Sequence, residues 1–169
     1  FRVVLNSATA TAPIAEVDEV VGYFGLRSIN LGKVQPHNVT RPLLNGIFTF
    51  FAGWLDQSWW PDGQYTAPTD VALASDVRAV AHFGLNMIRL HMKVNPERWY
   101  YHTDVAGIVV FQDMVQKICT THCSQRNLVY YLSDLKAMIH GRQNHPSIIQ
   151  FTLLNEADMW QLFDSKLYG

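Results

Sequence analysis

From residue 47 onward, the chain alternates short apolar segments with segments whose apolar residues recur at helical spacing. The apolar segments, which predict strands, cover residues 47–55, 86–91, 108–111 and 147–154. Strands that are apolar on both faces and separated by helices form parallel sheets, because each crossover helix covers a face of the sheet. This alternation therefore predicts an α/β fold built from strand–helix units.

Helices are predicted between these strands from their capping residues and their apolar spacing. Thr69 is a typical N-cap residue, and Gly84 follows the last apolar position of the first helix. Asn95 is the predicted N-cap of the second helix, with Pro96 in its first turn and Gly107 just after its end. A third helix is predicted over residues 128–141 and a fourth from about residue 159.

Two parallel folds compete for this pattern. An open doubly wound sheet prefers a glycine-rich phosphate loop after its first strand, and the segment Trp54–Gln57 is not one. A complete (β/α)8 barrel needs about 250 residues, and the chain has about half that number after residue 45. We therefore predict that residues 47–169 form the first half of a TIM barrel.

The amino-terminal part of the chain has a different pattern. Residues 1–30 mix β-branched and aromatic residues with glycines and show no helical period, which predicts strands. Residues 31–46 are rich in Asn, Gly and Pro, which are typical of turns. We predict a β domain over 1–30, a linker over 31–46 and the α/β domain over 47–169.

Composition excludes several classes of partner. Lys and Arg number 13 and Asp and Glu number 14, so the net charge of −1 argues against a nucleic-acid partner. No stretch approaches the roughly 18 apolar residues of a membrane span, so no membrane partner is predicted. Cys119 and Cys123 lack the further ligands of a zinc site and predict two thiols or one local disulfide.

The start of the chain and one short motif bear on its origin. The chain begins with Phe1 rather than Met, which predicts an internal piece of a longer protein. Asn38-Val39-Thr40 matches the N-glycosylation sequon, a three-residue motif that leaves the localisation open.

Polar residues follow every predicted strand of the α/β part. Side chains at the carboxyl ends of barrel strands face the active site, so this pattern predicts a site there. The alternative is an ion-pair network that stabilises the rim. Arg89, His91 and Lys93 would share one face of an extended strand and need anions opposite them. The polar residues are Asp56 and Gln57, then Arg89, His91 and Lys93, then Gln112 and Asp113, and lastly Asn155 and Glu156.

Glu156 is the only Glu at the end of a predicted core strand. A partly desolvated carboxyl in that position has a raised pKa and acts as an acid near neutral pH. Aromatic residues after the first and fourth strands either stack on sugars or pack over the core as a lid. These aromatic residues are Trp54, Trp59, Trp60, Tyr65 and Trp160.

The segment His145–Ile149, followed by Asn155 and Glu156, resembles the acid/base segment of glycoside hydrolase family 2. This family includes β-galactosidases, β-glucuronidases and β-mannosidases. Residues 55–66 resemble a segment typical of one subgroup, and residues 23–27 resemble the last strand of the immunoglobulin-like sandwich that precedes the barrel. Further similarities lie at 45–48, 84–89 and 111–114.

The resemblance implies a retaining β-glycosidase that needs no cofactor or metal and takes a carbohydrate substrate. Glu156 would be the general acid and then the general base, and Asn155 would bind the sugar 2-hydroxyl. The retaining reaction also uses a carboxylate nucleophile, which in this family is a Glu on a later strand. No Glu follows Glu156 in this chain. The resemblance places around the cleaved sugar Asp56, Arg89, His91 and Asp113, and we add Trp160.

Two other functions stay open at this point. Because the nucleophile is missing, the chain is also explained as a truncated, non-catalytic carbohydrate-binding product. A metal-dependent hydrolase is the other interpretation, since carboxylates and imidazole are ordinary metal ligands. Its ligands would be Asp56, His91, Asp113 and Glu156.

Overall fold

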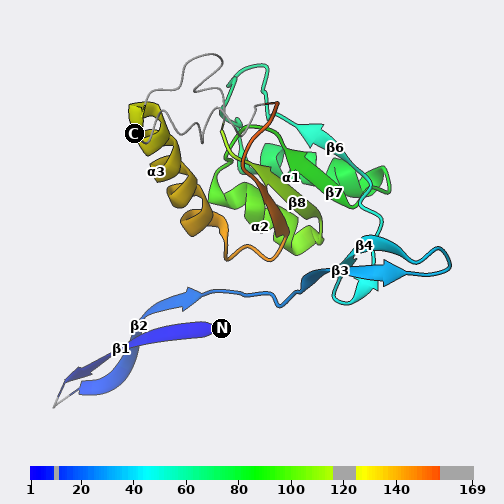
Figure 1. The fold of residues 1–169 in the computed structure, drawn as a ribbon. Helices are drawn as coiled ribbons and strands as arrows, with labels where there is room; N and C mark the ends of the chain where they lie inside the picture. The colour runs from blue at the N-terminus through cyan, green and yellow to red at the C-terminus, as the bar shows by residue number, and fades with distance from the viewer. Residues whose placement is uncertain (10–11, 116–124, 157–169) are drawn as a thin grey trace.

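The computed structural model describes residues 1–9, 12–115 and 125–156, and its centre is a parallel sheet (Figure 1). The strands are β6 (Gly53–Asp56), β7 (Met87–Leu90), β8 (Val109–Asp113) and β9 (Ile148–Thr152). They lie in chain order, and each pairs in parallel with the next. This confirms the α/β fold with a parallel sheet.

Helices separate the strands, as predicted. They are α1 (Asp70–His82), α2 (Glu97–Ala106) and α3 (Gln125–Arg142). The hydroxyl of Thr69 caps α1 by accepting a hydrogen bond of 3.1 Å from the backbone N–H of Ala72. Gly107 follows α2 in the left-handed conformation, with φ of 67°. In the part of the chain that the structure describes, no helix is both long and apolar enough to cross a membrane.

One cap prediction was wrong. The N-cap of α2 is Pro96, not Asn95, and no side chain caps this helix. Asn95 is buried instead, and its Nδ2 donates a hydrogen bond of 2.9 Å to the hydroxyl of Ser58. The side-chain amide of Asn95 therefore bonds to Ser58, which is distant in sequence, instead of capping the helix as the local sequence predicted.

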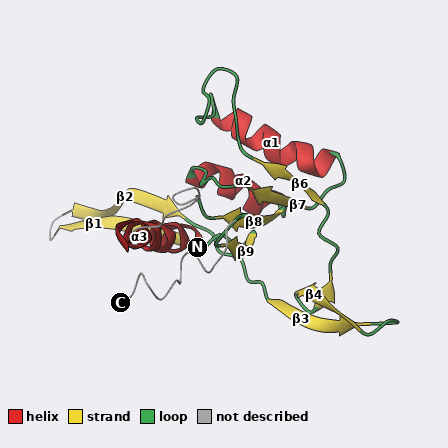
Figure 2. Ribbon diagram, turned by 45° about the horizontal axis from the view of Figure 1, so that its top comes forward, coloured by secondary structure: helices red, strands yellow, loops and turns green. Residues whose placement is uncertain are grey.

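The core lies between the sheet and the helices α1 and α2 (Figure 2). Ile88 and Leu90 of β7 are fully buried in it, together with Trp99 and Tyr100 of α2. Burying a side chain of this size stabilises the fold by roughly 1.5–3 kcal/mol. Since side chains alternate along a strand, Arg89 between the two buried residues lies on the opposite face, away from these helices.

A polar residue within this core is fully hydrogen-bonded. Gln112 donates 2.7 Å bonds to the carbonyls of Lys93 and Asp113, and its Oε1 accepts a 2.5 Å bond from the hydroxyl of Tyr100. Burial raises the pKa of Tyr100 to about 12, so this hydroxyl stays a donor. These hydrogen bonds offset the cost of burying the polar atoms of Gln112, and they connect the β7–α2 loop to β8.

The amino-terminal residues form two small antiparallel sheets. The strands β1 (Arg2–Thr9) and β2 (Ala12–Val21) pair as a hairpin that extends away from the parallel sheet (Figure 1). A three-stranded sheet follows, with β3 (Ile29–Val34), β4 (Val39–Leu44) and β5 (Ile47–Phe48). Strands were predicted at 1–30, but the segment 22–28, with its expected strand 23–27, contains none.

The loop expected at 31–46 was wrong, since it contains most of the β3–β4 hairpin. Of its turn-forming residues, Pro36 and Asn38 lie at the tip, and Asn45 and Gly46 form the turn between β4 and β5. Pro42 lies in β4 but outside the part that pairs with β5, so its missing N–H breaks no bond with β5. Asn38 of the sequon is exposed at this tip. The strand expected over 47–55 is two strands, β5 and β6, in different sheets.

Two side chains join the segment before β3 to the α/β part. Tyr23 donates a 2.6 Å hydrogen bond to the carboxylate of Asp104 in α2. Arg27 donates two bonds, of 2.7 and 3.1 Å, to the carbonyl of Ile148 at the start of β9. The segment 23–27 is therefore tied to the edge strand of the sheet.

Candidate active site

Three of the predicted site residues meet at the carboxyl ends of β7, β8 and β9. Arg89 contacts the carboxylate of Asp113 through Nε, at 3.1 Å, and through Nη2, at 2.8 Å. The same Nη2 donates a 2.9 Å bond to the side-chain oxygen of Asn155. One guanidinium therefore connects the ends of three neighbouring strands.

The carboxylate of this ion pair is shielded from water, whereas the side chain of Arg89 is 34% exposed. The side chain of Asp113 is 1% exposed. The hydrogen bonds that Arg89 donates to the carboxylate of Asp113 raise the pKa of Arg89 above its ordinary value, with a smaller contribution from the charge of Glu156. Removing one partner of such a pair leaves an uncompensated buried charge, which costs about 3–5 kcal/mol. Arg89 and Asp113 thus fix the site's geometry as well as its charge.

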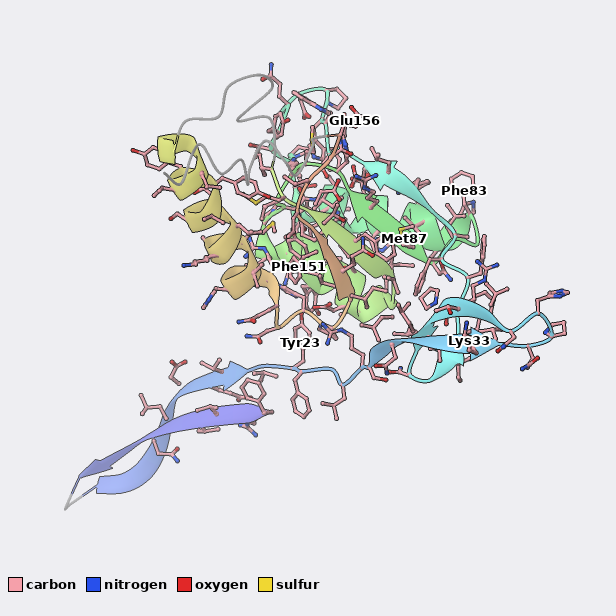
Figure 3. All side chains as sticks on the ribbon, viewed as in Figure 1. Tyr23, Lys33, Phe83, Met87, Phe151 and Glu156 are labelled. Carbon is pink, nitrogen blue, oxygen red and sulfur yellow. The ribbon has the colours of Figure 1, made fainter. Side chains whose placement is uncertain are left out.

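Glu156 follows Asn155 directly and lies at the carboxyl end of the sheet (Figure 3). Its backbone is left-handed, with φ of 52°, a conformation that strains residues other than glycine. The expected desolvation of this carboxyl was wrong, since Glu156 is exposed.

Asp56 and His91 lie at the neighbouring strand ends but outside the Arg89 cluster. The ring Nδ1 of His91 is 2.9 Å from Nε2 of Gln57, and its backbone N–H donates to the carbonyl of Asp56 at 2.8 Å. The carboxylate of Asp56 accepts bonds from the N–H and hydroxyl of Ser58, at 2.5 and 3.1 Å. Asp56 therefore shapes the loop after β6.

The predicted row of three cations on one face was wrong. β7 ends at Leu90, and Met92 has a φ of 51°, so the extended backbone does not continue to Lys93. Lys93 is buried and donates to the carbonyls of Ser58 and Tyr65, at 2.9 and 2.8 Å. The role of Lys93 as a donor to these carbonyls was not predicted, because nothing in the local sequence indicates a left-handed backbone at Met92.

Of the remaining candidate residues, one packs against the core and the others lie outside the residues that the structure describes. Trp54 packs against the core and meets Phe83 edge to face at 6.0 Å, so it is not a wall of the site. Trp160, Cys119 and Cys123 lie outside the described residues. Among described side chains, no group of three or more His, Cys, Asp or Glu is arranged to hold a metal ion.

Gln57 was noted only as the residue after Asp56, and its partner was missed. Its contact with His91 joins the β6 and β7 strand ends. Its position directly after an acidic residue at a strand end is the signal that was available.

Several solved structures with a similar fold are β-glucuronidases. The enzyme from Ruminococcus gnavus in complex with D-glucuronic acid aligns over 97% of this chain with a TM-score of 0.74 and 19% identity. The enzyme from Parabacteroides merdae aligns over 89% of the chain with a TM-score of 0.67 and 19% identity. At such identities the similarity establishes the fold.

The chain spans 27% and 17% of the lengths of these two enzymes. No protein-family model matches the sequence. No curated protein matches it either. The chain therefore shares the fold of one part of β-glucuronidases, an α/β region with a parallel sheet preceded by antiparallel strands.

Proposed function

We propose that this chain is part of a retaining β-glycoside hydrolase and carries its acid/base residue, Glu156. The observation that carries the proposal is the cluster of Arg89, Asp113 and Asn155 beside Glu156 at the carboxyl ends of parallel strands. This is the end at which (β/α)8 enzymes place their active sites. The fold shared with β-glucuronidases, which hydrolyse glycosidic bonds, supports the same interpretation.

The proposed mechanism uses Glu156 twice. Its carboxyl protonates the leaving glycosidic oxygen in the first step, and its carboxylate activates water in the second. Because Glu156 is exposed, a glycosidic oxygen reaches it from solvent. Retaining enzymes use a second carboxyl, about 5–5.5 Å from the first, as the nucleophile. Residues 157–169 contain no Glu that could be this nucleophile.

The neighbouring residues bind the sugar that is cleaved. Asn155, oriented by Arg89, presents its amide to the 2-hydroxyl. Asp113 holds the guanidinium in place, and His91 offers its ring at the rim beside Gln57. Asp56 acts through the loop that it anchors. Trp160, which lies outside the described residues, stays a proposed substrate-binding residue.

In this proposal, residues 47–169 are the first half of a TIM barrel and residues 1–30 the end of an immunoglobulin-like domain. The consecutive parallel order β6-β7-β8-β9 supports the barrel, because a barrel adds each new strand on the same side. The β1–β2 hairpin supports a β domain before it.

The test is hydrolysis of 4-nitrophenyl β-glycosides of glucuronic acid, galactose, mannose and glucose by the intact protein. We expect turnover of at least one of them and retention of β-configuration in the first product, observed by proton NMR. Release of the α-anomer as first product would contradict the retaining mechanism.

A second candidate is a carbohydrate-binding protein without catalysis, since the polar groups of Arg89, Asp113 and Asn155 would suit sugar hydroxyls whether or not a bond is cleaved. Sugar binding without turnover of any of the four glycosides would support this candidate and exclude the hydrolase.

A further inference from the structure

The loop between β6 and α1 is held at its neck by one buried cation. Nζ of Lys93 donates to the carbonyl of Ser58 at 2.9 Å and to the carbonyl of Tyr65 at 2.8 Å. These two carbonyls lie seven residues apart, at the two ends of the segment 58–65. Lys93 is 7% exposed, so these bonds form away from bulk water, where they are stronger.

Other contacts hold the same segment in one conformation. Ser58, which is buried, bonds to the carboxylate of Asp56 and accepts from Nδ2 of Asn95. Trp60 and Gln64 exchange two backbone bonds, of 2.8 and 2.9 Å, across the tip. The segment is thus a preformed structure supported from β6 and from the β7–α2 loop.

This support presents two aromatic rings side by side. Trp59 and Tyr65 meet edge to face, with ring centroids 4.3 Å apart. The two side chains are 57% and 55% exposed. Nζ of Lys93 lies 4.8 Å from the centre of the Tyr65 ring and so supports this ring from the protein side. An exposed pair of large rings held rigidly is costly to leave in water and suits a flat apolar ligand face.

The pair lies on the loop that follows β6, at the same carboxyl end of the parallel sheet as the proposed catalytic residues. Gln57, next to Ser58, contacts His91, which directly follows β7, and Arg89 lies within that strand. Arg89 in turn contacts Asn155, and the charge of Glu156 acts on its pKa. The polar groups of the cluster suit sugar hydroxyls, whereas the rings on the loop suit the group that is attached to that sugar.

We propose that Trp59 and Tyr65 form a stacking subsite for the leaving group of the glycoside, and that Lys93 is the positioning residue that sets this subsite. The leaving group it takes has a flat apolar face, either an aromatic ring or the apolar face of a second sugar. This inference rests on the proposed function for the identity of its ligand.

The experiment measures binding without turnover in the intact protein carrying Glu156→Gln. Isothermal titration calorimetry gives the affinities for phenyl and methyl 1-thio-β-glycosides of the same four sugars, which share a sugar and differ in the leaving group. We expect Trp59→Ala to weaken phenyl glycosides about 10-fold, or about 1.4 kcal/mol, and methyl glycosides less than 2-fold.

Lys93→Met separates positioning from general stability. It removes both bonds to the loop, so we expect the same selective loss of phenyl affinity, with no further loss when it is combined with Trp59→Ala. A merely structural role would lower both affinities alike. Lys93→Gln keeps donors near the carbonyls, should the Met variant not fold, and is expected to retain part of the phenyl preference.

The matched control is Phe83→Ala. Phe83 is an exposed aromatic residue at the other end of α1 and should leave both affinities unchanged. Replacing the phenyl group by a β-linked glucosyl group distinguishes a sugar leaving group from an aromatic one.

An unchanged ratio of phenyl to methyl affinity in Trp59→Ala, or no binding of any probe, would overturn the inference. If glycosides are hydrolysed and the ratio does not change, the proposed function stands and the subsite fails. If no glycoside is hydrolysed but phenyl binding depends on Trp59, the subsite stands and the proposed hydrolase fails.

Discussion

At the scale of single residues, burial and nearby charges change the pKa of Asp76 in α1. This residue is partly buried, and burial together with the nearby charge of Asp56 raises its pKa to about 6, although Lys93 acts in the opposite direction. A carboxyl whose pKa is higher in the folded state than in the unfolded one destabilises the fold increasingly as pH rises from about 4 to 6.

We therefore predict that Asp76→Asn stabilises the protein above pH 6 and not at pH 4. The gain at pH 8 should be roughly 1–2 kcal/mol, less than two pKa units would give in full, because water still reaches the carboxyl. Thermal unfolding at both pH values measures it. Asp134→Asn on the exposed surface of α3 is the control, and equal effects at the two pH values would contradict the explanation.

At the scale of elements, one histidine joins α2 to the loop between α3 and β9. The ring of His145 lies 2.6 Å from the carboxylate of Asp104 and 2.7 Å from that of Glu97. Tyr23 also donates to Asp104, and Arg142 of α3 pairs with Glu97. Burial lowers the pKa of His145, but the two carboxylates outweigh burial and raise it.

A raised histidine pKa stabilises the fold at low pH. The stabilisation is complete below the unfolded value near 6.5 and is lost as pH rises through the higher folded value. We predict that His145→Gln costs about 1–2 kcal/mol at pH 6 and less at pH 9, measured by urea unfolding. His140→Gln on the exposed side of α3 should show no such difference, and a constant cost for His145→Gln would contradict the ionic role.

At the scale of the whole molecule, the fold class and the helices followed from apolar periodicity and caps such as Thr69, whereas the consecutive strand order was implied only by the half-barrel prediction. The hairpin at 31–46 was missed because Asn, Gly and Pro residues, some of them in its strands and some in its turns, were interpreted together as a linker. That Arg89, Asp113 and Asn155 lie at the same end of the sheet was predicted, since parallel strands bring their ends together, but the contact of one guanidinium with both side chains was not. The redirection of Lys93 was not predicted either, because it depends on the left-handed backbone at Met92.

The isolated 169-residue chain has a sheet whose outer strands, β6 and β9, each pair on one side among the described residues. Unpaired strand edges are templates for association. We predict that this chain by itself dimerises or aggregates at micromolar concentration, as measured by size-exclusion chromatography with light scattering. A stable monomer would contradict the half-barrel interpretation.

The acid/base role of Glu156 is the central claim, and its most direct test compares Glu156→Gln with the unmodified intact protein on two leaving groups. Protonation matters little for 2,4-dinitrophenolate and greatly for methoxide or a sugar alkoxide. We predict a loss in kcat/KM of at least about 100-fold for the poor leaving groups and less than about 10-fold for the dinitrophenyl glycoside. Equal losses on both substrates would show that Glu156 does not supply the proton.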